Sequence, residues 1–188
     1  MKINLKNRAV IAPQPVLIVA TYDENGTPDA MNAAWGGQCA YHNVALNLAT
    51  GHKTTENIKK TGAFTLNLGT RDTLVISDYF GVVSGRKEDK LTKAGVRFSK
   101  SGHVNAPIIE DYPIVMECKV VSVREELGET RVVGEIVNTQ ADESVLDENG
   151  KVDLLKMGLI FFDSERMSYR TVGGEVGKAF HDGNTLKQ

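Results

Sequence analysis

Hydrophobic and polar residues alternate along the first part of the chain in a way that predicts a β-hairpin. Residues 16–22 are mainly apolar and β-branched, and a second strand-like segment covers residues 30–34. The Asn25-Gly26 pair between them is typical of the tight turn between antiparallel strands, because both residues tolerate a positive φ. We therefore expect the fold to open with strands rather than with a helix.

The alternation continues over residues 38–50, for which we expect a single further strand. Larger apolar side chains occupy one of its faces and small side chains occupy the other. The larger set comprises Val44, Leu46 and Leu48, and the smaller set comprises Ala45, Asn47 and Ala49. Because small side chains let a ligand approach the backbone, the second face is a candidate floor for a ligand site.

Three short helices are expected after this strand. A threonine, Thr54 or Thr55, is a plausible N-cap for a helix that stops before Gly62, and another strand follows over residues 63–68. The spacing of apolar residues predicts further helices over about 70–80 and 87–94.

The second half of the chain has the pattern of a β protein. Residues 113–126 and 131–142 predict a long antiparallel hairpin, and residues 158–162 and 167–172 supply two more strands. About seven strands with three short helices favour a mainly β fold, an antiparallel Greek-key-like barrel, over a parallel sheet. We expect the whole chain, 1–188, to form one domain, with 173–188 as a glycine-rich C-terminal tail.

Composition and charge narrow the class of protein. The 188 residues are 41% hydrophobic and 24% charged, which is ordinary for a globular domain and unlike a disordered chain. The 22 basic and 24 acidic residues give a formal charge of -2, so no net positive field favours nucleic acid or an anionic membrane surface. No apolar run suits a membrane helix and no secretory signal is visible, so we expect a reduced, cytoplasmic protein.

The spacing of residues does not match several common catalytic and binding motifs. Residues 173–179 are similar to a phosphate loop but lack its first glycine and its hydroxyl residue after lysine, and no G-x-G-x-x-G motif follows a strand. Cys39 and His42 would point to opposite faces of a strand, so we expect no zinc site. Cys118 lies in an alternating apolar strand, where we expect a buried structural thiol and not a catalytic cysteine.

One constellation has a chemical interpretation: His52-Lys53-Thr54-Thr55 followed by Asn57, at the junction of a strand and a helix. The start of a helix offers unpaired N–H groups and a partial positive charge, and the hydroxyl and basic side chains add donors and charge. These groups can bind a phosphate. The alternative is ordinary helix capping by threonine, and the spacing alone leaves both interpretations open.

Several short motifs follow one another in a specific order along residues 12–180. They are Pro13-x-Pro15-Val16, Asn25-Gly26-x-Pro28-Asp29-Ala30-Met31-Asn32-Ala33-Ala34-Trp35, His52-Lys53-Thr54-Thr55-Glu56-Asn57-Ile58, Asp78-Tyr79-Phe80-Gly81, Ser84-Gly85-Arg86 and Asp89-Lys90. Together they resemble the flavin reductase-like FMN-binding split-barrel family, and in particular its flavoredoxin-type members.

The resemblance implies a homodimer of six-stranded split barrels, with one noncovalent FMN per subunit at or near the subunit interface. It implies that the phosphate meets Lys53, Thr54, Thr55 and Asn57 with His52 beside them, that the isoalloxazine meets Asn32, Ala33, Ala34 and Trp35, and that Ala49, Thr50 and Gly51 run beneath the ribityl chain and ring. Ser84, Lys90 and Phe180 complete the implied contacts, with Lys90 approaching from beyond the core of the barrel and Phe180 covering the flavin from the tail.

The implied activity is that of a flavin-dependent oxidoreductase without a catalytic side chain. A hydride from NADH or NADPH reaches the flavin N5, and electrons pass on to a free flavin, a ferric chelate or a partner protein. The alternatives are a non-enzymatic FMN-binding electron carrier reduced by a partner protein, and a barrel that binds another small ligand or none. Lys53 stands where many relatives use an arginine, so a bidentate contact to phosphate is absent here. For the tail, flavin covering and disorder both remain open.

Overall fold

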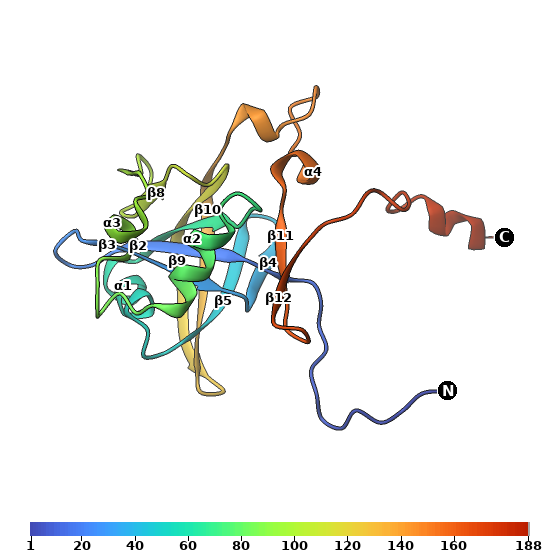
Figure 1. Ribbon diagram of the computed structural model, residues 1–188, viewed down its shortest axis with the longest axis horizontal. Coiled ribbons are helices and arrows are strands. Elements are labelled where there is room, and N and C mark those ends of the chain that lie inside the picture. The colour runs from blue at the N-terminus through green and yellow to red at the C-terminus, as the bar shows by residue number, and fades with distance from the viewer. Residues whose placement is uncertain (188) are drawn as a thin grey trace.

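A seven-stranded antiparallel sheet forms the body of the computed structural model, which describes residues 1–187 (Figure 1). In spatial order its strands are β3 (Pro28–Ala33), β2 (Leu17–Tyr22), β6 (Ala63–Leu68), β9 (Ile114–Glu126), β10 (Glu129–Ala141), β5 (Asn43–Ala49) and β4 (Gly36–Ala40). Side chains of β3 and β5, which are far apart in this order, share one buried cluster, so the sheet curls into a barrel. The predicted mainly β, antiparallel split-barrel fold is confirmed.

Both predicted hairpins are present. β2 pairs with β3 along its whole length, and Gly26 takes a φ of 80° in the turn. β9 pairs with β10, and Leu127 and Gly128 occupy the turn with φ values of 54° and 83°. The residues that shape each turn are adjacent in the sequence, which is why the pattern finds them.

The single strand predicted over residues 38–50 is wrong. The chain turns at Tyr41-His42 and forms two paired strands, β4 and β5. The large residues expected on one face of this segment are nevertheless buried in the barrel. The additional strand gives the main sheet seven strands instead of the six that the resemblance implies.

Short elements account for the other differences from prediction. Residues 1–187 contain twelve strands, four α-helices and two 3-10 helices, more than the seven or so strands and three helices expected. β1 (Gln14–Pro15), β11 (Ile160–Asp163) and β12 (Ser168–Thr171) form a small sheet, and β7 (Phe98–Lys100) pairs with β8 (Pro107–Ile109). Strands this short show no clear alternation.

The helices are α1 (Lys53–Thr61), α2 (Leu74–Val82), α3 (Lys90–Ala94) and α4 (Leu154–Met157), with 3-10 turns at Glu143–Val145 and Asp182–Leu186. α2 and α3 begin later than expected, and the Asp89 carboxylate caps α3. His52, and not a threonine, is the N-cap residue of α1, and its side chain makes no capping hydrogen bond. α1 ends at Gly62 as predicted, because glycine readily takes the φ of 67° found there.

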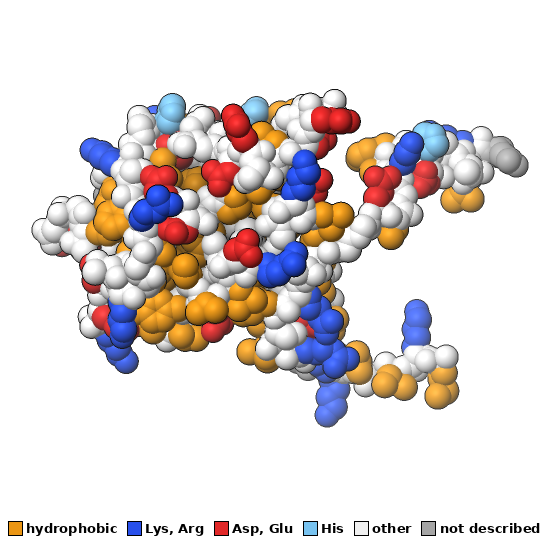
Figure 2. Space-filling view, turned by 45° about the horizontal axis from the view of Figure 1, so that its top comes forward, with side chains coloured by type: hydrophobic (Ala, Val, Ile, Leu, Met, Phe, Trp, Pro, Cys, Tyr) orange, Lys and Arg blue, Asp and Glu red, His pale blue; other side chains and the backbone are white. Residues whose placement is uncertain are grey.

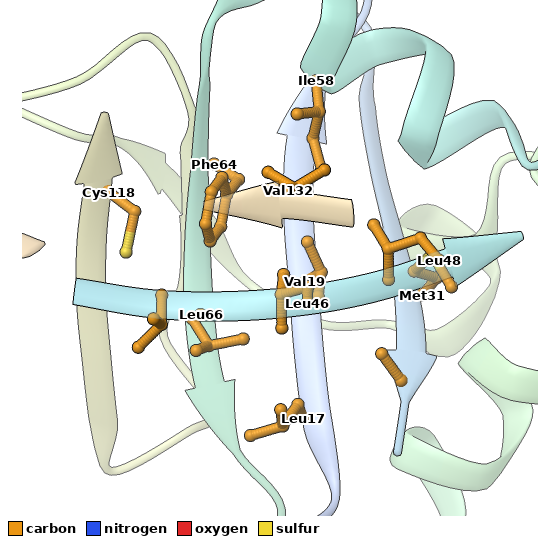
Figure 3. Close-up of a cluster of buried hydrophobic side chains, with 12 residues drawn as sticks. Leu17, Val19, Met31, Leu46, Leu48, Ile58, Phe64, Leu66, Cys118 and Val132 are labelled. Carbon is orange, nitrogen blue, oxygen red and sulfur yellow. The ribbon is translucent and has the colours of Figure 1, made fainter. Parts of the chain in front are cut away.

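Two hydrophobic clusters stabilise the barrel. Leu46 and Phe64 belong to the inner cluster, which fills the barrel (Figure 3). The outer cluster contains Phe80 of α2 and Leu91 of α3, which pack against the outside of β2 and β3. Each such buried side chain contributes about 1.5–3 kcal/mol. This packing holds α2 and α3 in place, and with them the connecting segment 83–89.

Both ends of the chain stand away from the barrel (Figure 1). Residues 1–13 and 173–187 are exposed. Phe180, which the resemblance implies would cover the flavin, lies fully in solvent within a single chain. Within residues 1–187, no helix combines the length and the apolar character needed to cross a bilayer.

Candidate functional site

A groove runs from the start of α1, across the face of β3 and β5, to Trp35. It consists of a cleft of about 300 Å³, a middle hollow of about 210 Å³ and an outer hollow of about 790 Å³. The cleft and the middle hollow are both lined by Met31, Asn32 and His52. The middle and outer hollows are both lined by Ala34, Trp35 and Asn47. Because neighbouring parts share lining residues, they adjoin one another, and we refer to the three together as the groove.

The first turn of α1 forms one wall of the cleft. His52 is extended (φ -73°, ψ 142°), and the first backbone hydrogen bond of the helix runs from the Glu56 N–H to the His52 carbonyl. In the part of the chain that the structure describes, the N–H groups of Lys53 and Thr54 have no hydrogen-bond partner. Unpaired N–H groups and the helix dipole favour an anion at this position.

Lys53, Arg86 and Lys90 line the cleft together with one carboxylate, Asp29. The Lys53 ammonium donates to the Gly85 carbonyl at 3.5 Å, which ties the segment between α2 and α3 to α1. Each cation also has a carboxylate partner: Lys53 lies 3.7 Å from Asp23, Arg86 lies 2.7 Å from Glu56, and Lys90 pairs with Asp29. The cleft therefore offers three cationic donors to a phosphate monoester, but their charges are partly balanced within the chain.

Lys90 and Asp29 form a buried ion pair in the cleft. Both side chains are 3% exposed, and Lys90 Nζ lies 3.4 Å from Asp29 Oδ1. Asp29 Oδ2 accepts a hydrogen bond from the Thr54 hydroxyl at 2.5 Å. Burial lowers the pKa of Lys90, and the Asp29 carboxylate opposes this shift. A second anion in the cleft would oppose it further, so the buried ammonium favours anion binding.

Asn32 lies where the cleft meets the middle hollow. Its amide nitrogen donates to the Ser77 carbonyl at 3.0 Å and to the Tyr169 hydroxyl at 3.5 Å. Tyr169 donates in turn to Asp78 Oδ1 at 2.7 Å, and burial together with this carboxylate raises the pKa of Tyr169 to about 12. Because its N–H groups are engaged, Asn32 offers its oxygen to the groove as an acceptor.

Small residues line the middle and outer hollows, as the alternation predicts. Ala45 and Asn47 line the outer hollow, and Asn47 and Ala49 line the middle one. Trp35, which is 57% exposed, stands at the junction of the two hollows. A flat aromatic ligand can therefore lie close to the β5 backbone beside an accessible indole ring.

Most of the predicted contact residues come together in the walls of the groove. They are Asn32, Ala33, Ala34, Trp35, Ala49, Gly51, His52, Lys53, Thr54, Ser84 and Lys90. Thr50, Thr55, Asn57 and Phe180 do not line it. Direct contact between the lining residues and FMN stays a prediction.

The structure contradicts the prediction that the side chains of Thr55 and Asn57 reach a phosphate. Thr55 is 0% exposed and Asn57 is 3% exposed. The Thr55 hydroxyl donates to the Ala49 carbonyl at 3.0 Å, and the Asn57 amide donates to the Thr21 hydroxyl at 3.1 Å. Both side chains therefore anchor α1 to the strands and face the interior of the fold.

The hydroxyl groups of Thr50 and Thr54 also have partners within the chain. Thr50 pairs with the Thr130 hydroxyl at 3.0 Å, and Thr54 donates to Asp29. Capping by a threonine side chain, the alternative left open by the sequence, does not occur at α1. The helix therefore presents backbone N–H groups, and not threonine hydroxyls, to the cleft.

Asp29, Gly85 and Arg86 line the cleft without having been predicted as site residues. All three stand in motifs that carry the family resemblance, and the Ser84-Gly85-Arg86 turn is the one local signal that could have found them. Asp29 gives no such signal, because its partners Thr54 and Lys90 are distant in the sequence.

The groove fits FMN in chemical character. Cations and unpaired N–H groups at one end suit a phosphate, and a face of small side chains at the other suits a planar ring. Cys118 offers no competing nucleophile, because burial raises its pKa to about 12.

Comparison with known proteins agrees with this assignment. Residues 10–170 match the family described as the flavin reductase like domain, and the chain therefore belongs to this family. A relative from Archaeoglobus fulgidus, an uncharacterized protein, is 31% identical over 129 residues, which cover 68% of this chain and 72% of that protein.

Solved structures extend the similarity to nearly the whole chain. The flavoredoxin of Desulfovibrio vulgaris (Miyazaki F) is 34% identical, with a TM-score of 0.92 over 97% of this chain and 100% of that one. The flavoredoxin of Methanosarcina acetivorans is 29% identical, with a TM-score of 0.91 over 99% of each chain. Nitrilotriacetate monooxygenase component B from Bacillus cereus is 15% identical, with a TM-score of 0.82 over 95% of this chain and 98% of that one, and shares the fold.

Proposed function

We propose that this protein binds FMN and acts as an oxidoreductase that moves electrons from NADH or NADPH to a flavin, ferric or protein acceptor. One observation carries this proposal: a cleft with three cationic side chains and unpaired N–H groups at the start of α1 adjoins a sheet face of small residues. A ligand with a phosphate at one end and a flat ring at the other matches both regions. Membership of the flavin reductase-like family supports the same ligand.

In this proposal the cleft holds the phosphate and the two hollows hold the ring. The N–H groups at the start of α1, Lys53, Ser84, Arg86 and Lys90 surround the phosphate. Asn32 accepts a hydrogen bond from the ligand where the two regions meet. Bound FMN supplies hydride acceptance and electron transfer, so the side chains bind and orient it and none needs to act as an acid or base.

A second function is favoured by one observation, the similarity to two flavoredoxins. The chain would then be an electron carrier reduced by a partner protein and not by a nicotinamide. Anaerobic mixing with NADH or NADPH separates the two functions. Rapid bleaching of the flavin absorbance supports the reductase, whereas bleaching by dithionite alone supports the carrier.

We further infer a homodimer in which a second copy covers the open side of the groove. Both terminal arms carry large apolar side chains that nothing within residues 1–187 covers (Figure 2): Ile3, Leu5, Val10, Ile11, Val176, Phe180 and Leu186. β4 is an exposed edge strand beside the outer hollow. Exposed apolar groups and free strand edges favour association. Light scattering should give twice the subunit mass, and dissociation should release flavin.

Flavin fluorescence titration tests FMN binding directly. We expect about one FMN per subunit, with weaker binding of FAD and of riboflavin, which lacks the phosphate.

Lys53→Ala should weaken FMN binding about tenfold and riboflavin binding little, because a charge-assisted contact is lost. Lys59→Ala is the matched control, since Lys59 lies on the same helix and pairs with Glu125 as Lys53 pairs with Asp23, but does not line the cleft. Failure of FMN to bind below millimolar concentration would remove the proposed function.

A further inference from the structure

Asp29 is the one carboxylate among the described residues that line the cleft, and it is almost fully buried. Its Oδ2 atom accepts the Thr54 hydroxyl at 2.5 Å, and its Oδ1 atom lies 3.4 Å from Lys90 Nζ. Thr54 belongs to the first turn of α1, and Lys90 is the first residue of α3. A single side chain on β3 therefore joins the starts of two helices.

The Ser84-Gly85-Arg86 turn closes against the same carboxylate. A Cβ atom on Gly85 would lie 2.0 Å from Asp29 Oδ1 and 3.3 Å from Lys53 Cδ. Only glycine lets the backbone approach a side chain so closely. Lys53 also donates to the Gly85 carbonyl, so both α1 and Asp29 contact the turn.

We propose that Asp29 is a positioning residue that holds Lys90, the first turn of α1 and the Gly85 turn so that they converge on the phosphate of the ligand. This inference rests on the proposed function, since the phosphate is that of FMN. Asp29 does not bind the phosphate itself, because a carboxylate is an acceptor and repels another anion.

The charge of Asp29 taken alone would weaken phosphate binding, so its contribution comes through the groups that it positions. Without the carboxylate, the Lys90 ammonium keeps only the Phe80 carbonyl, 3.5 Å away, as a partner within the described chain. Burial without a counter-charge favours the neutral amine. Loss of Asp29 therefore lowers the pKa of Lys90 further and removes the contacts that hold the first turn of α1 and the start of α3.

The test is the ratio of the riboflavin to the FMN dissociation constant, here called the phosphate preference, measured by flavin fluorescence on folded protein. Asp29→Asn should lower the phosphate preference about 10- to 100-fold while riboflavin affinity changes little. Gly85→Ala should lower it about tenfold, because it keeps both charges but pushes the turn away from Asp29. The Asp29→Asn/Lys90→Met double variant should lose less than the product of the two single losses, because one residue acts through the other.

Glu117→Gln is the matched control, because Glu117 is a buried carboxylate that lines no part of the groove. It should lower stability and leave the phosphate preference unchanged.

An unchanged preference in Asp29→Asn would make Asp29 a purely structural residue, and a raised preference would make it a purely repulsive charge. Either result overturns the proposal. If Asp29→Asn fails to fold, an unchanged preference in Gly85→Ala has the same consequence. If the wild-type protein itself does not bind FMN, the proposed function fails instead.

Discussion

Two buried carboxylates, Asp29 in the cleft and Glu117 in the barrel wall, are stabilised in different ways. Glu117 is 0% exposed and accepts hydrogen bonds from the Ser101 hydroxyl and from the amides of Asn138 and Gln140, the latter two at 2.5 and 2.8 Å. All three donors are neutral. Asp29 instead faces an ammonium group and a single hydroxyl.

The difference separates a structural carboxylate from one beside a ligand site. Ser101 Oγ also accepts the N–H groups of His103 and Val104, so Glu117 fixes the loop 101–106 against β9. This network satisfies its own members and leaves no group for a ligand. The Lys90 ammonium has three hydrogens and contacts the Asp29 carboxylate and the Phe80 carbonyl, so it can still donate a hydrogen bond to an anion.

Glu117→Ala should have the largest effect on stability. It leaves several buried donors without an acceptor, so we expect a loss of about 3–5 kcal/mol in the free energy of unfolding. Urea denaturation measures this loss, and the phosphate preference of the folded fraction should stay constant. A loss below about 1 kcal/mol would show that water replaces the carboxylate and that the network is not closed.

Thr54→Val should have a smaller effect at the other carboxylate. The substitution removes one hydrogen bond to Asp29, which keeps Lys90 as its counter-charge, so we expect a loss of about 1.5–3 kcal/mol. The phosphate preference should fall less than in Asp29→Asn, because the contacts to Lys90 and the Gly85 turn remain. Thr139→Val, at an exposed position of β10, is the control and should change stability by less than about 0.5 kcal/mol. Equal losses in the two variants would contradict a special role for the bond between Thr54 and Asp29.

Lowering the pH should reduce the difference in unfolding free energy between the wild-type protein and Glu117→Gln. Burial raises the pKa of Glu117, but the hydrogen bonds from Ser101, Asn138 and Gln140 lower it more, so the folded-state pKa lies below the ordinary value of 4.5. The stabilisation is therefore complete above about pH 4.5 and is lost as the pH falls through the folded-state pKa. The difference in unfolding free energy should shrink by at most about 1.4 kcal/mol per pH unit in that range. Urea denaturation of both proteins at several pH values measures it, and a difference independent of pH would contradict an ionised Glu117.

Local signals account for what the sequence predicts correctly. The Asn25-Gly26 turn and the strands beside it lie within a few residues of one another, and the same is true of the β9–β10 hairpin. The start of α1 is also a local feature, so the sequence can predict the unpaired N–H groups found there. The break at Tyr41-His42 carries no glycine or proline, which is why the chain reads as one continuous strand.

Tertiary packing accounts for the rest. Thr54 and Thr55 are adjacent, yet one hydroxyl meets Asp29 and the other meets the Ala49 carbonyl, because the strands beneath α1 decide which face of the helix is covered. Asn57 is directed inward by Thr21, which lies on β2. Asp29 becomes important only when β3, α1 and α3 are assembled, and no periodicity in the sequence reports that assembly.

Tyr169→Phe should have the smallest effect and should act at the ring end of the groove. The hydroxyl of Tyr169 donates to Asp78 and accepts from the Asn32 amide, and its raised pKa keeps it protonated at ordinary pH. Removing it costs about 0.5–1.5 kcal/mol of stability, because one hydrogen-bonded network is broken while the aromatic ring stays packed. The Asn32 amide then loses a partner that fixes its orientation, so FMN and riboflavin should both bind about threefold more weakly and the phosphate preference should not change. Tyr41→Phe, at a tyrosine that is 86% exposed, is the control and should alter neither affinity. Unequal losses for the two flavins would place the influence of Tyr169 on the phosphate cleft, and the two ends of the groove would then not be separable.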